Sequence, residues 1–334
     1  MDFGIFDHLD RHGVPLPQFY EERLRLIELY DQAGFFSYHL AEHHSTPLGM
    51  APSPSVFLAA VAQRTKRLRF GPMVYALPLY HPLRLIEEIC MLDQMSGGRL
   101  DIGFGRGASP IELGYFGQDA KDSQAIYTEG LALIIKGLTE PSLTFAGEHF
   151  RFDRVPMSLA PLQKPHPPIW YGVHSIDAAD RAARRALHTI NLDSLAEAKA
   201  CCERFRAVWR ETRNDAPLPK LGIGRFIVVA ETDAAALALA RRAYPKWHDA
   251  FTYLPRMHGY AQRHPRPADF DTLMAVGQGV AGSAASVAKW LRHEVEETGA
   301  NYVVGQFAFG DLTAAEFTRS VELFAKHVMP ALRS

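Results

Sequence analysis

A carboxylate and two imidazoles follow directly after an apolar run of the sequence. The run of residues 35–40 is succeeded by Ala41 and then by Glu42, His43 and His44. A buried strand that ends in titratable groups is typical of a strand that delivers them to a pocket. We interpret one of the two histidines as an acid, a base or a hydrogen-bond donor there, with Glu42 orienting it or pairing nearby. The alternative is a histidine with a structural hydrogen bond only.

The same cluster is a poor candidate for a metal site. Adjacent residues of an extended chain point to opposite sides, so His43 and His44 cannot easily share one ion. No other histidine spacing in the sequence supports a set of ligands. We therefore expect no metal in this protein.

A glycine-rich segment, residues 103–108, follows another apolar run and formally matches the dinucleotide-binding pattern G-x-G-x-x-G/A. A true fingerprint opens a helix, whereas Ser109-Pro110, Gly114 and Gly117 interrupt any helix here, and three strand–helix units precede the motif. We therefore reject that interpretation. Glycines at a strand end still let a planar ligand or a phosphate approach the backbone, and Arg106 among them is a natural phosphate clamp. The alternative is that Arg106 forms a structural ion pair.

A third candidate site is the segment Tyr171-Gly172-Val173-His174-Ser175, which precedes a helix predicted to start at Asp177. Backbone N–H groups at a helix N-terminus together with the Ser175 hydroxyl favour anion binding. Ordinary capping by Ser175 or Asp177 explains the same residues equally well.

The elements that position these residues alternate along the chain. Strands are expected at residues 3–6, 35–40, within 68–77, and at 100–104, 169–171, 189–192, 221–230 and 302–307. Helices are expected at 19–33, 54–64, 81–95, 123–138, 177–186, 194–213, 233–243, 283–298 and 313–332, with a short hairpin within 143–152. Eight apolar strands followed by helices predict an α/β fold, a (β/α)8 TIM barrel formed as a single domain over residues 1–334. Residues 244–282, rich in aromatic residues, proline and histidine, are interpreted as an inserted lid near strand seven or as a disordered excursion.

The composition limits the partners and the setting. Thirty-six basic residues stand against 37 acidic ones in 334 residues, so the net charge of -1 gives no reason to expect nucleic acid or an anionic membrane. Three cysteines without framework spacing favour a reduced, cytoplasmic setting. We expect neither a signal peptide nor a membrane span, because no basic and apolar leader and no apolar stretch of about 18 residues is found.

Four motifs in a fixed order carry a family resemblance: AEHH at 41–44, LPLYHP at 77–82, LDQMSGGR at 92–99 and GRG at 105–107. Their order and spacing are similar to those of the bacterial luciferase α subunit, and the chain resembles the flavin-dependent luciferase-like monooxygenases from Phe3 to Pro330. The resemblance implies a barrel that binds reduced FMN and activates oxygen through a flavin C4a-peroxide.

The resemblance also assigns roles to individual residues. It implies that His43 is the catalytic histidine, that Arg106, next to Gly105, binds the FMN phosphate, and that His174 and Ser175 are further phosphate contacts. Met73-Val74 aligns with a non-prolyl cis peptide that supports the flavin ring in the family. Gly105 stands where light-emitting subunits carry a reactive cysteine, and Ala178 replaces a threonine that assists phosphate binding, so light emission and an aldehyde substrate are in doubt.

We therefore expect a two-component monooxygenase that receives reduced FMN from a separate flavin reductase and oxygenates a small organic substrate with O2, a carbonyl compound being the candidate. We also expect a homodimer. Two alternatives stay open: an oxidoreductase that uses the deazaflavin F420, and a non-catalytic flavin-binding partner subunit. Related F420 barrels often carry Asp-His where this chain has Glu42-His43, which favours FMN. A barrel hydrolase lacks a suitable carboxylate pair or nucleophile motif.

Overall fold

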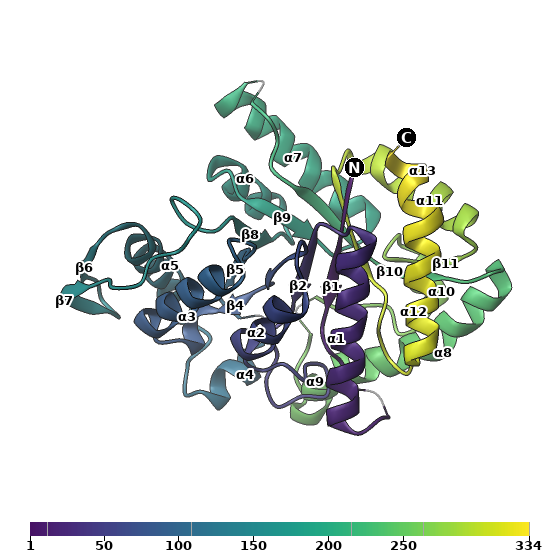
Figure 1. Cartoon of the computed structure of the whole chain (residues 1–334), viewed down its shortest axis with the longest axis horizontal. Helices are drawn as coiled ribbons and strands as arrows, with labels where there is room; N and C mark the ends of the chain where they lie inside the picture. Colours follow the sequence, from purple (N-terminus) through teal and green to yellow (C-terminus); the bar gives the residue numbers. More distant parts are fainter. Residues whose placement is uncertain (12, 108, 215, 263, 334) are drawn as a thin grey trace.

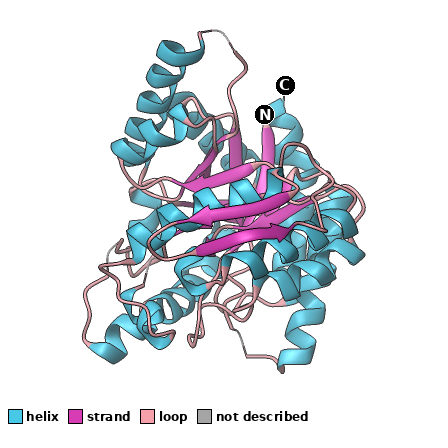
Figure 2. Cartoon of the chain, turned by 90° about the vertical axis from the view of Figure 1, so that its left-hand side faces the viewer, coloured by secondary structure: helices cyan, strands magenta, loops and turns pink. Residues whose placement is uncertain are grey.

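The computed structural model describes residues 1–334 except 12, 108, 215, 263 and 334. Parallel strands form a nearly closed barrel that helices surround (Figure 1). In Figure 2 the strands lie in the middle of the molecule with helices around them. The hydrogen-bonded order around the barrel is β3-β2-β1-β12-β10-β9-β8-β5-β4. The predicted TIM barrel is confirmed.

The barrel strands and the additional strands occupy these bounds: β1 Asp2–Asp7, β2 Ser37–Leu40, β3 Arg69–Pro72, β4 Tyr75–Ala76, β5 Ile102–Gly105, β6 Ser142–Ala146, β7 Arg151–Pro156, β8 Ile169–Gly172, β9 His188–Asn191, β10 Leu221–Val229, β11 Gly279–Gly282 and β12 Tyr302–Gln306. The antiparallel pair β6–β7 is the expected hairpin, extended to Pro156.

The helices are α1 Leu16–Ala33, α2 Pro54–Arg64, η1 Leu77–Leu79, α3 Pro82–Met95, α4 Pro110–Tyr115, α5 Ser123–Thr139, α6 Ile176–Arg184, α7 Leu195–Arg213, α8 Asp233–Phe251, α9 Tyr253–His258, α10 Phe270–Ala275, α11 Ala284–Thr298, α12 Ala314–Leu323, η2 Phe324–Val328 and α13 Met329–Arg333. Within the part of the chain that the structure describes, no helix is both long and apolar enough to cross a membrane.

Local sequence signals explain where several helices begin and end. Gly34 ends α1 in the left-handed conformation at φ 78°, which glycine adopts at little steric cost. Pro54 and Pro82 occupy the first positions of α2 and α3, where no backbone donor is required. Ser53 lies at the N-cap position of α2 as expected, but its side chain makes no capping hydrogen bond.

The third strand closes the ring in two parts. β3 pairs with β2, and after the cis peptide Met73-Val74 the chain continues as β4, which pairs with β5 through Tyr75 and Phe104. An isolated bridge between Phe70 and Leu100 completes the contact. The residues around the cis peptide therefore lie on the inner edge of the barrel, between two neighbouring strands.

Residues 244–282 are not a structureless excursion, which corrects one of the two interpretations of this segment. The helix expected to end at residue 243 continues as α8 to Phe251 with Pro245 inside it, and α9 and α10 follow. β11 then pairs in parallel with the C-terminal half of β10, through Phe226–Val229. The barrel thus has a ninth strand that the apolar pattern did not reveal.

The core has two layers. A large apolar cluster fills the space between the strands and the surrounding helices, while a smaller one inside the barrel contains Phe6, Met73, Trp170 and Tyr302 among its members. A buried ion pair joins β10 to α11, because the Arg225 guanidinium donates to Glu294 Oε2 from Nε at 3.0 Å and from Nη2 at 2.8 Å. The inner cluster forms the floor on which the site is built.

Candidate active site

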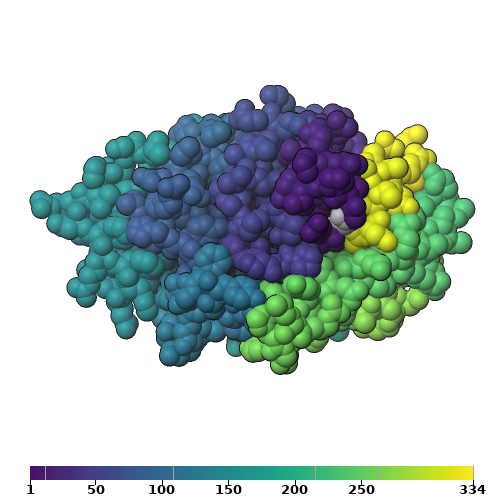
Figure 3. Space-filling view, turned by 90° about the horizontal axis from the view of Figure 1, so that it is seen from below, coloured from purple at the N-terminus to yellow at the C-terminus, as the bar shows by residue number. Residues whose placement is uncertain are grey.

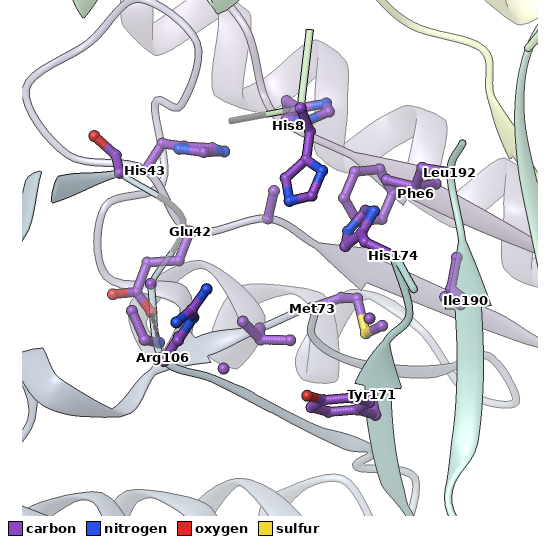
Figure 4. A pocket seen from close by; sticks show the side chains of 18 of the residues that line it. Phe6, His8, Glu42, His43, Met73, Arg106, Tyr171, His174, Ile190 and Leu192 are labelled. Carbon is purple, nitrogen blue, oxygen red and sulfur yellow. Dashed lines mark hydrogen bonds between the residues drawn. The ribbon is translucent and has the colours of Figure 1, made fainter. Parts of the chain in front are cut away.

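A cavity of about 580 Å³ opens at the C-terminal ends of the barrel strands. Active sites of barrels with this architecture are built on that face. Figure 4 shows side chains from β1, β2, β5, β8 and β9 converging on it. All the sequence-predicted site residues line this cavity: His43, Met73, Val74, Gly105, Arg106, His174 and Ser175.

Two short helices cover part of the cavity mouth. α4 and α9 lie at the lower side of Figure 1 and meet on the face seen in Figure 3. The Tyr115 hydroxyl of α4 lies 2.7 Å from Nε2 of His258 in α9. The segment after β5 and the segment after β10 are therefore joined across the strand ends.

His43 is paired with a carboxylate that the sequence analysis missed. Nδ1 of His43 lies 3.2 Å from Oε1 of Glu112, and the same oxygen accepts the backbone N–H of His44 at 2.7 Å. Glu112 is placed by α4, whose start is capped by the Ser109 hydroxyl and led by Pro110. The Ser109-Pro110 pair therefore starts a short helix rather than preventing one.

The pair is electrostatically asymmetric. Burial alone would lower the pKa of His43, but the nearby Glu112 carboxylate outweighs it and raises that pKa above its usual value. Burial likewise opposes ionisation of Glu112, yet His43 and the His44 backbone N–H hold its pKa below the ordinary range. Both shifts favour a charged imidazolium–carboxylate pair at the cavity wall.

Glu42 pairs with His44 rather than with His43, so of the two roles considered for Glu42 the structure supports pairing nearby. Oε1 of Glu42 lies 2.8 Å from Nε2 of His44, and its Oε2 accepts from the Tyr80 hydroxyl at 2.8 Å and from the Ala76 N–H at 3.2 Å. Since residues two apart share one side of an extended chain, Glu42 and His44 meet while His43 faces the other way.

A second imidazole stands beside His43. His8, directly after β1, stacks on His43 with ring centroids 5.8 Å apart (Figure 4). Burial, together with His43 and Arg266, lowers the pKa of His8 well below its usual value. The cavity therefore offers a histidine that favours the charged form next to one that favours the neutral form, a proton donor beside a proton acceptor.

The cis peptide predicted at Met73-Val74 is present in the structure. Both residues line the cavity, as does Gly105. A Cβ atom at Gly105 would lie 2.3 Å from Cγ2 of Val74, so a side chain at this position would displace Val74. Gly105, the last residue of β5, therefore keeps a flat surface at this wall.

Arg106 is half-buried at the cavity wall, and Figure 4 places it across the cavity from His8. Among the residues that the structure describes, no carboxylate lies within ion-pair distance of its guanidinium. The alternative of a structural ion pair therefore gains no support. An arginine without a carboxylate partner at a wall of flat glycine backbone fits a phosphate-bearing planar ligand.

His174 and Ser175 have protein partners of their own. The Ser175 hydroxyl accepts the Ala178 N–H at 3.2 Å, so it caps α6. Nδ1 of His174 lies 2.9 Å from Oδ2 of Asp193, and its ring stacks on His264 with centroids 4.6 Å apart. Capping and anion binding are compatible, because other N–H groups at the start of α6 remain available.

His174, Asp193 and His264 bring three possible metal ligands within 4.8 Å of one another, which the sequence spacing did not indicate. The Arg266 guanidinium lies 3.6 Å from the same Asp193 carboxylate. A cation would have to approach next to this fixed positive charge. We therefore interpret the cluster as a network in which ring stacking on His174 and an ion pair with Asp193 hold His264 and Arg266 beside the loop after β9.

The sequence matches the luciferase-like monooxygenase family over residues 1–302, and the protein belongs to this family. The chain is 41% identical over 312 residues to "uncharacterized protein y4wF" of Sinorhizobium fredii, covering 93% of this chain and 91% of that one. It is 28% identical over 254 residues to the oxygenase component of the flavin-dependent trigonelline monooxygenase of Acinetobacter baylyi, with 72% and 68% covered.

Solved structures repeat the same architecture. The monooxygenase RslO1 of Streptomyces bottropensis has a TM-score of 0.89 at 26% identity, covering 99% of this chain and 100% of that one. The oxygenating constituent of 3,6-diketocamphane monooxygenase from Pseudomonas putida, in complex with FMN, has a TM-score of 0.80 at 22% identity, with 99% and 98% covered. An F420-dependent secondary alcohol dehydrogenase has a TM-score of 0.75 at 17% identity, with 100% and 99% covered. At 22% and 17% identity, the last two structures show a likeness of the fold alone.

Proposed function

We propose that this protein is the oxygenase component of a two-component, FMN-dependent monooxygenase. The observation that carries the proposal is Arg106, a cavity-lining guanidinium without a carboxylate partner among the described residues, next to the flat wall of Gly105 and the cis peptide. Membership of a flavin monooxygenase family supports the same cofactor. Reduced FMN held there would supply the two electrons with which O2 yields one oxygen atom for the substrate and one for water.

The residues of the chain would hold the cofactor in two places. Arg106, assisted by the start of α6 at Ser175 and by the His174 side chain, would receive the phosphate. Met73 and Val74, which line the cavity between β3 and β4, would support the ring. A second cavity of about 300 Å³ shares Arg181 with the main one and adds positive charge beside it.

His43 would manage the proton of the oxygenation step. Its raised pKa favours the protonated imidazole, and Glu112 fixes the ring by holding Nδ1. Nε2 is then the nitrogen left to donate into the cavity. Neighbouring His8, whose pKa is lowered by burial and by His43, would stay neutral and so add no second positive charge beside His43.

The walls around these groups would keep water out. Phe6, Phe226, Trp247 and Phe251 line the cavity on the side of β1, β10 and α8. A water-poor cavity strengthens the electrostatic interactions inside it and protects a reactive oxygen species from loss to solvent. The same apolar walls favour a small organic substrate.

A separate flavin reductase is part of the proposal, supported by a relative that is itself named an oxygenase component. We also propose a reduced, cytoplasmic setting, in line with three free, buried cysteines, and a homodimer, for which exposed Val56, Met91 and Met95 on α2 and α3 offer an apolar surface. Light scattering of the purified protein tests the homodimer.

The alternatives are an F420-dependent oxidoreductase, to which one structural likeness points at the level of the fold, and a non-catalytic flavin-binding subunit. Absorbance titrations with FMN and F420 in both redox states, followed by oxygen consumption with reduced FMN, separate the three. We expect tight binding of reduced FMN and its oxidation by O2 in the cavity. Preference for F420, or bound FMN without any change in its reaction with O2, would refute the proposal.

A further inference from the structure

A third arginine, besides Arg106 and Arg181, lines the cavity. Arg266 lies between α9 and α10, and its side chain is 9% exposed. Nη2 of its guanidinium lies 3.6 Å from Asp193 Oδ1, beyond hydrogen-bond distance. With the Gln278 carboxamide oxygen turned toward it, Nη1 donates to that oxygen. Within the described part of the chain, the other guanidinium donors have no hydrogen-bond acceptor.

The charged groups around Arg266 do not fully neutralise the positive charge of its guanidinium. Asp193 is shared, because His174 Nδ1 holds its two oxygens at 2.9 and 3.0 Å, closer than Arg266 does. Arg225, the next cation, is already satisfied by Glu294. A buried guanidinium with spare donors needs further acceptors, and here the open side is the cavity.

The surroundings indicate what kind of acceptor fits. Trp247, Phe226 and Phe251 line the same part of the cavity, and the Trp247 ring lies 5.4 Å from that of His8. Arg266 acts electrostatically on His8 as well, so the guanidinium and the aromatic wall flank one space. A planar apolar body with one acidic group would satisfy both the rings and the guanidinium.

We propose that the substrate is an aromatic or similarly planar carboxylate, and that Arg266 is the specificity-determining residue that receives its carboxylate. Calling the bound carboxylate a substrate rests on the proposed function, but its binding to Arg266 needs no flavin. The inference gives separate roles to two of the three arginines that line the cavity: Arg106 serves the cofactor phosphate, and Arg266 serves the substrate carboxylate.

The experiment is calorimetric titration of the flavin-free protein with benzoate, phenylacetate and salicylate, each compared with its primary amide. We expect the wild type to prefer the carboxylate of a pair by at least about tenfold, since hydrogen bonds to charged groups contribute about 1.5–3 kcal/mol. Arg266→Gln should remove that preference, and Arg266→Lys should keep part of it. Arg256→Ala is the matched control, because Arg256 lies on the same segment but is exposed and paired with Asp249.

Titration with FMN and riboflavin makes the test two-sided. Arg106→Ala should lose the preference for FMN over riboflavin while keeping the preference for carboxylate over amide, and Arg266→Gln should show the reverse pattern. No carboxylate preference in the wild type for any pair, an unchanged preference in folded Arg266→Gln, or loss of the FMN preference in that variant would each overturn the proposal. Failure of FMN to bind any variant would instead refute the proposed cofactor and leave the carboxylate result standing.

Discussion

In the proposed function, the guanidinium of Arg106 would contribute to binding through one group of the cofactor, its phosphate. Arg106→Ala should therefore weaken FMN about ten- to a hundredfold and riboflavin far less, the range expected for one charge-assisted contact. Fluorescence titration with both ligands measures the two affinities. An equal loss for FMN and riboflavin would mean that Arg106 does not contact the phosphate.

His43 should matter for oxygenation and little for folding, because it lies after β2 at the cavity mouth. His43→Ala should bind FMN nearly normally but lower product formation by about 10²–10⁴-fold, the usual contribution of an acid–base group. The reducing equivalents should appear as hydrogen peroxide instead.

Peroxide and product are assayed together at equal flavin consumption in the His43→Ala experiment. His44→Ala is the control, because its imidazole faces Glu42 rather than Glu112 and should have the smaller effect. Unchanged coupling in His43→Ala would remove the residue from the mechanism.

Glu112 acts through His43, so its effect is visible in a titration. Glu112→Gln removes the carboxylate that raises the pKa of His43 while leaving an oxygen for the His44 N–H. NMR titration should therefore place the pKa of His43 lower in Glu112→Gln than in the wild type. The lower limb of the pH–activity profile should move in the same direction, and a purely structural role of Glu112 would move neither.

The pair formed by His43 and Glu112 also has a defined pH window for stability. The raised pKa of His43 means that its contribution is complete at low pH and is lost as the pH rises through that pKa. The lowered pKa of Glu112 means that its contribution is lost as the pH falls. The pair thus stabilises the fold at pH values between the pKa of Glu112 and that of His43. In that range Glu112→Gln should lower the free energy of unfolding most.

The candidate site residues predicted from the sequence all line one cavity, but the pattern left Glu42 either orienting a histidine or pairing nearby. The alternation of an extended chain pairs Glu42 with His44. That alternation was available in the sequence and had already been used to separate the two histidines. Glu112 was out of reach, because 69 positions separate it from His43 and a six-residue helix brings it back.

At the scale of elements, residues 244–282 supply part of the cavity wall through Trp247, Phe251, His264, Arg266 and Gln278. We predict that they act as a lid. Limited proteolysis should cut between α9 and α10 in the free protein and be suppressed with reduced FMN and substrate, because His264 and Arg266 line the cavity. Cleavage confined to other regions, with this segment resistant in every state, would contradict the lid.

The structure of this segment shows why its pattern was hard to interpret. Pro245 within α8 resembles a helix end, although the helix continues to Phe251. β11, Gly279–Gly282, consists of two glycines, a valine and an alanine, so it carries only a weak apolar pattern. Its pairing with β10 depends on a long-range contact that no local signal specifies.

At the scale of the whole molecule, the ring of strands is joined near its first and last members by a buried carboxyl. Asp10, after β1, accepts the Gly310 N–H at 2.6 Å beyond β12, and burial raises its pKa to about 7. Its stabilising contribution is complete when it is protonated and is lost as the pH rises through about 7.

Asp10→Asn should therefore gain stability relative to the wild type as the pH rises from 5 to 8. The gain in the free energy of unfolding should reach about 2 kcal/mol, because a pKa shift of one unit corresponds to roughly 1.4 kcal/mol. Urea unfolding at both pH values measures it. A difference between the two proteins that does not change with pH would show that Asp10 does not titrate in this range.

The barrel itself was predictable because its signals repeat. Apolar runs without alternation indicated strands buried on both faces, and glycines such as Gly34 and Gly97 marked the ends of helices. Repeating local signals do not predict contacts between distant segments. Examples are the Tyr115–His258 contact and the approach of Arg266 to Asp193. These depend on how the loops fold over the finished barrel.

The way residues 244–282 are held has an evolutionary consequence. The segment leaves β10 through α8 and returns through β11, which pairs with the same strand, so its two ends are fixed at one place in the barrel. Such an insertion behaves as an exchangeable module. Changes within it can alter what the cavity accepts while the proposed cofactor residues, at the ends of β3, β5 and β8, are inherited unchanged. A chimera that carries this segment from a relative should therefore acquire the relative's substrate preference and retain the FMN affinity of the recipient barrel.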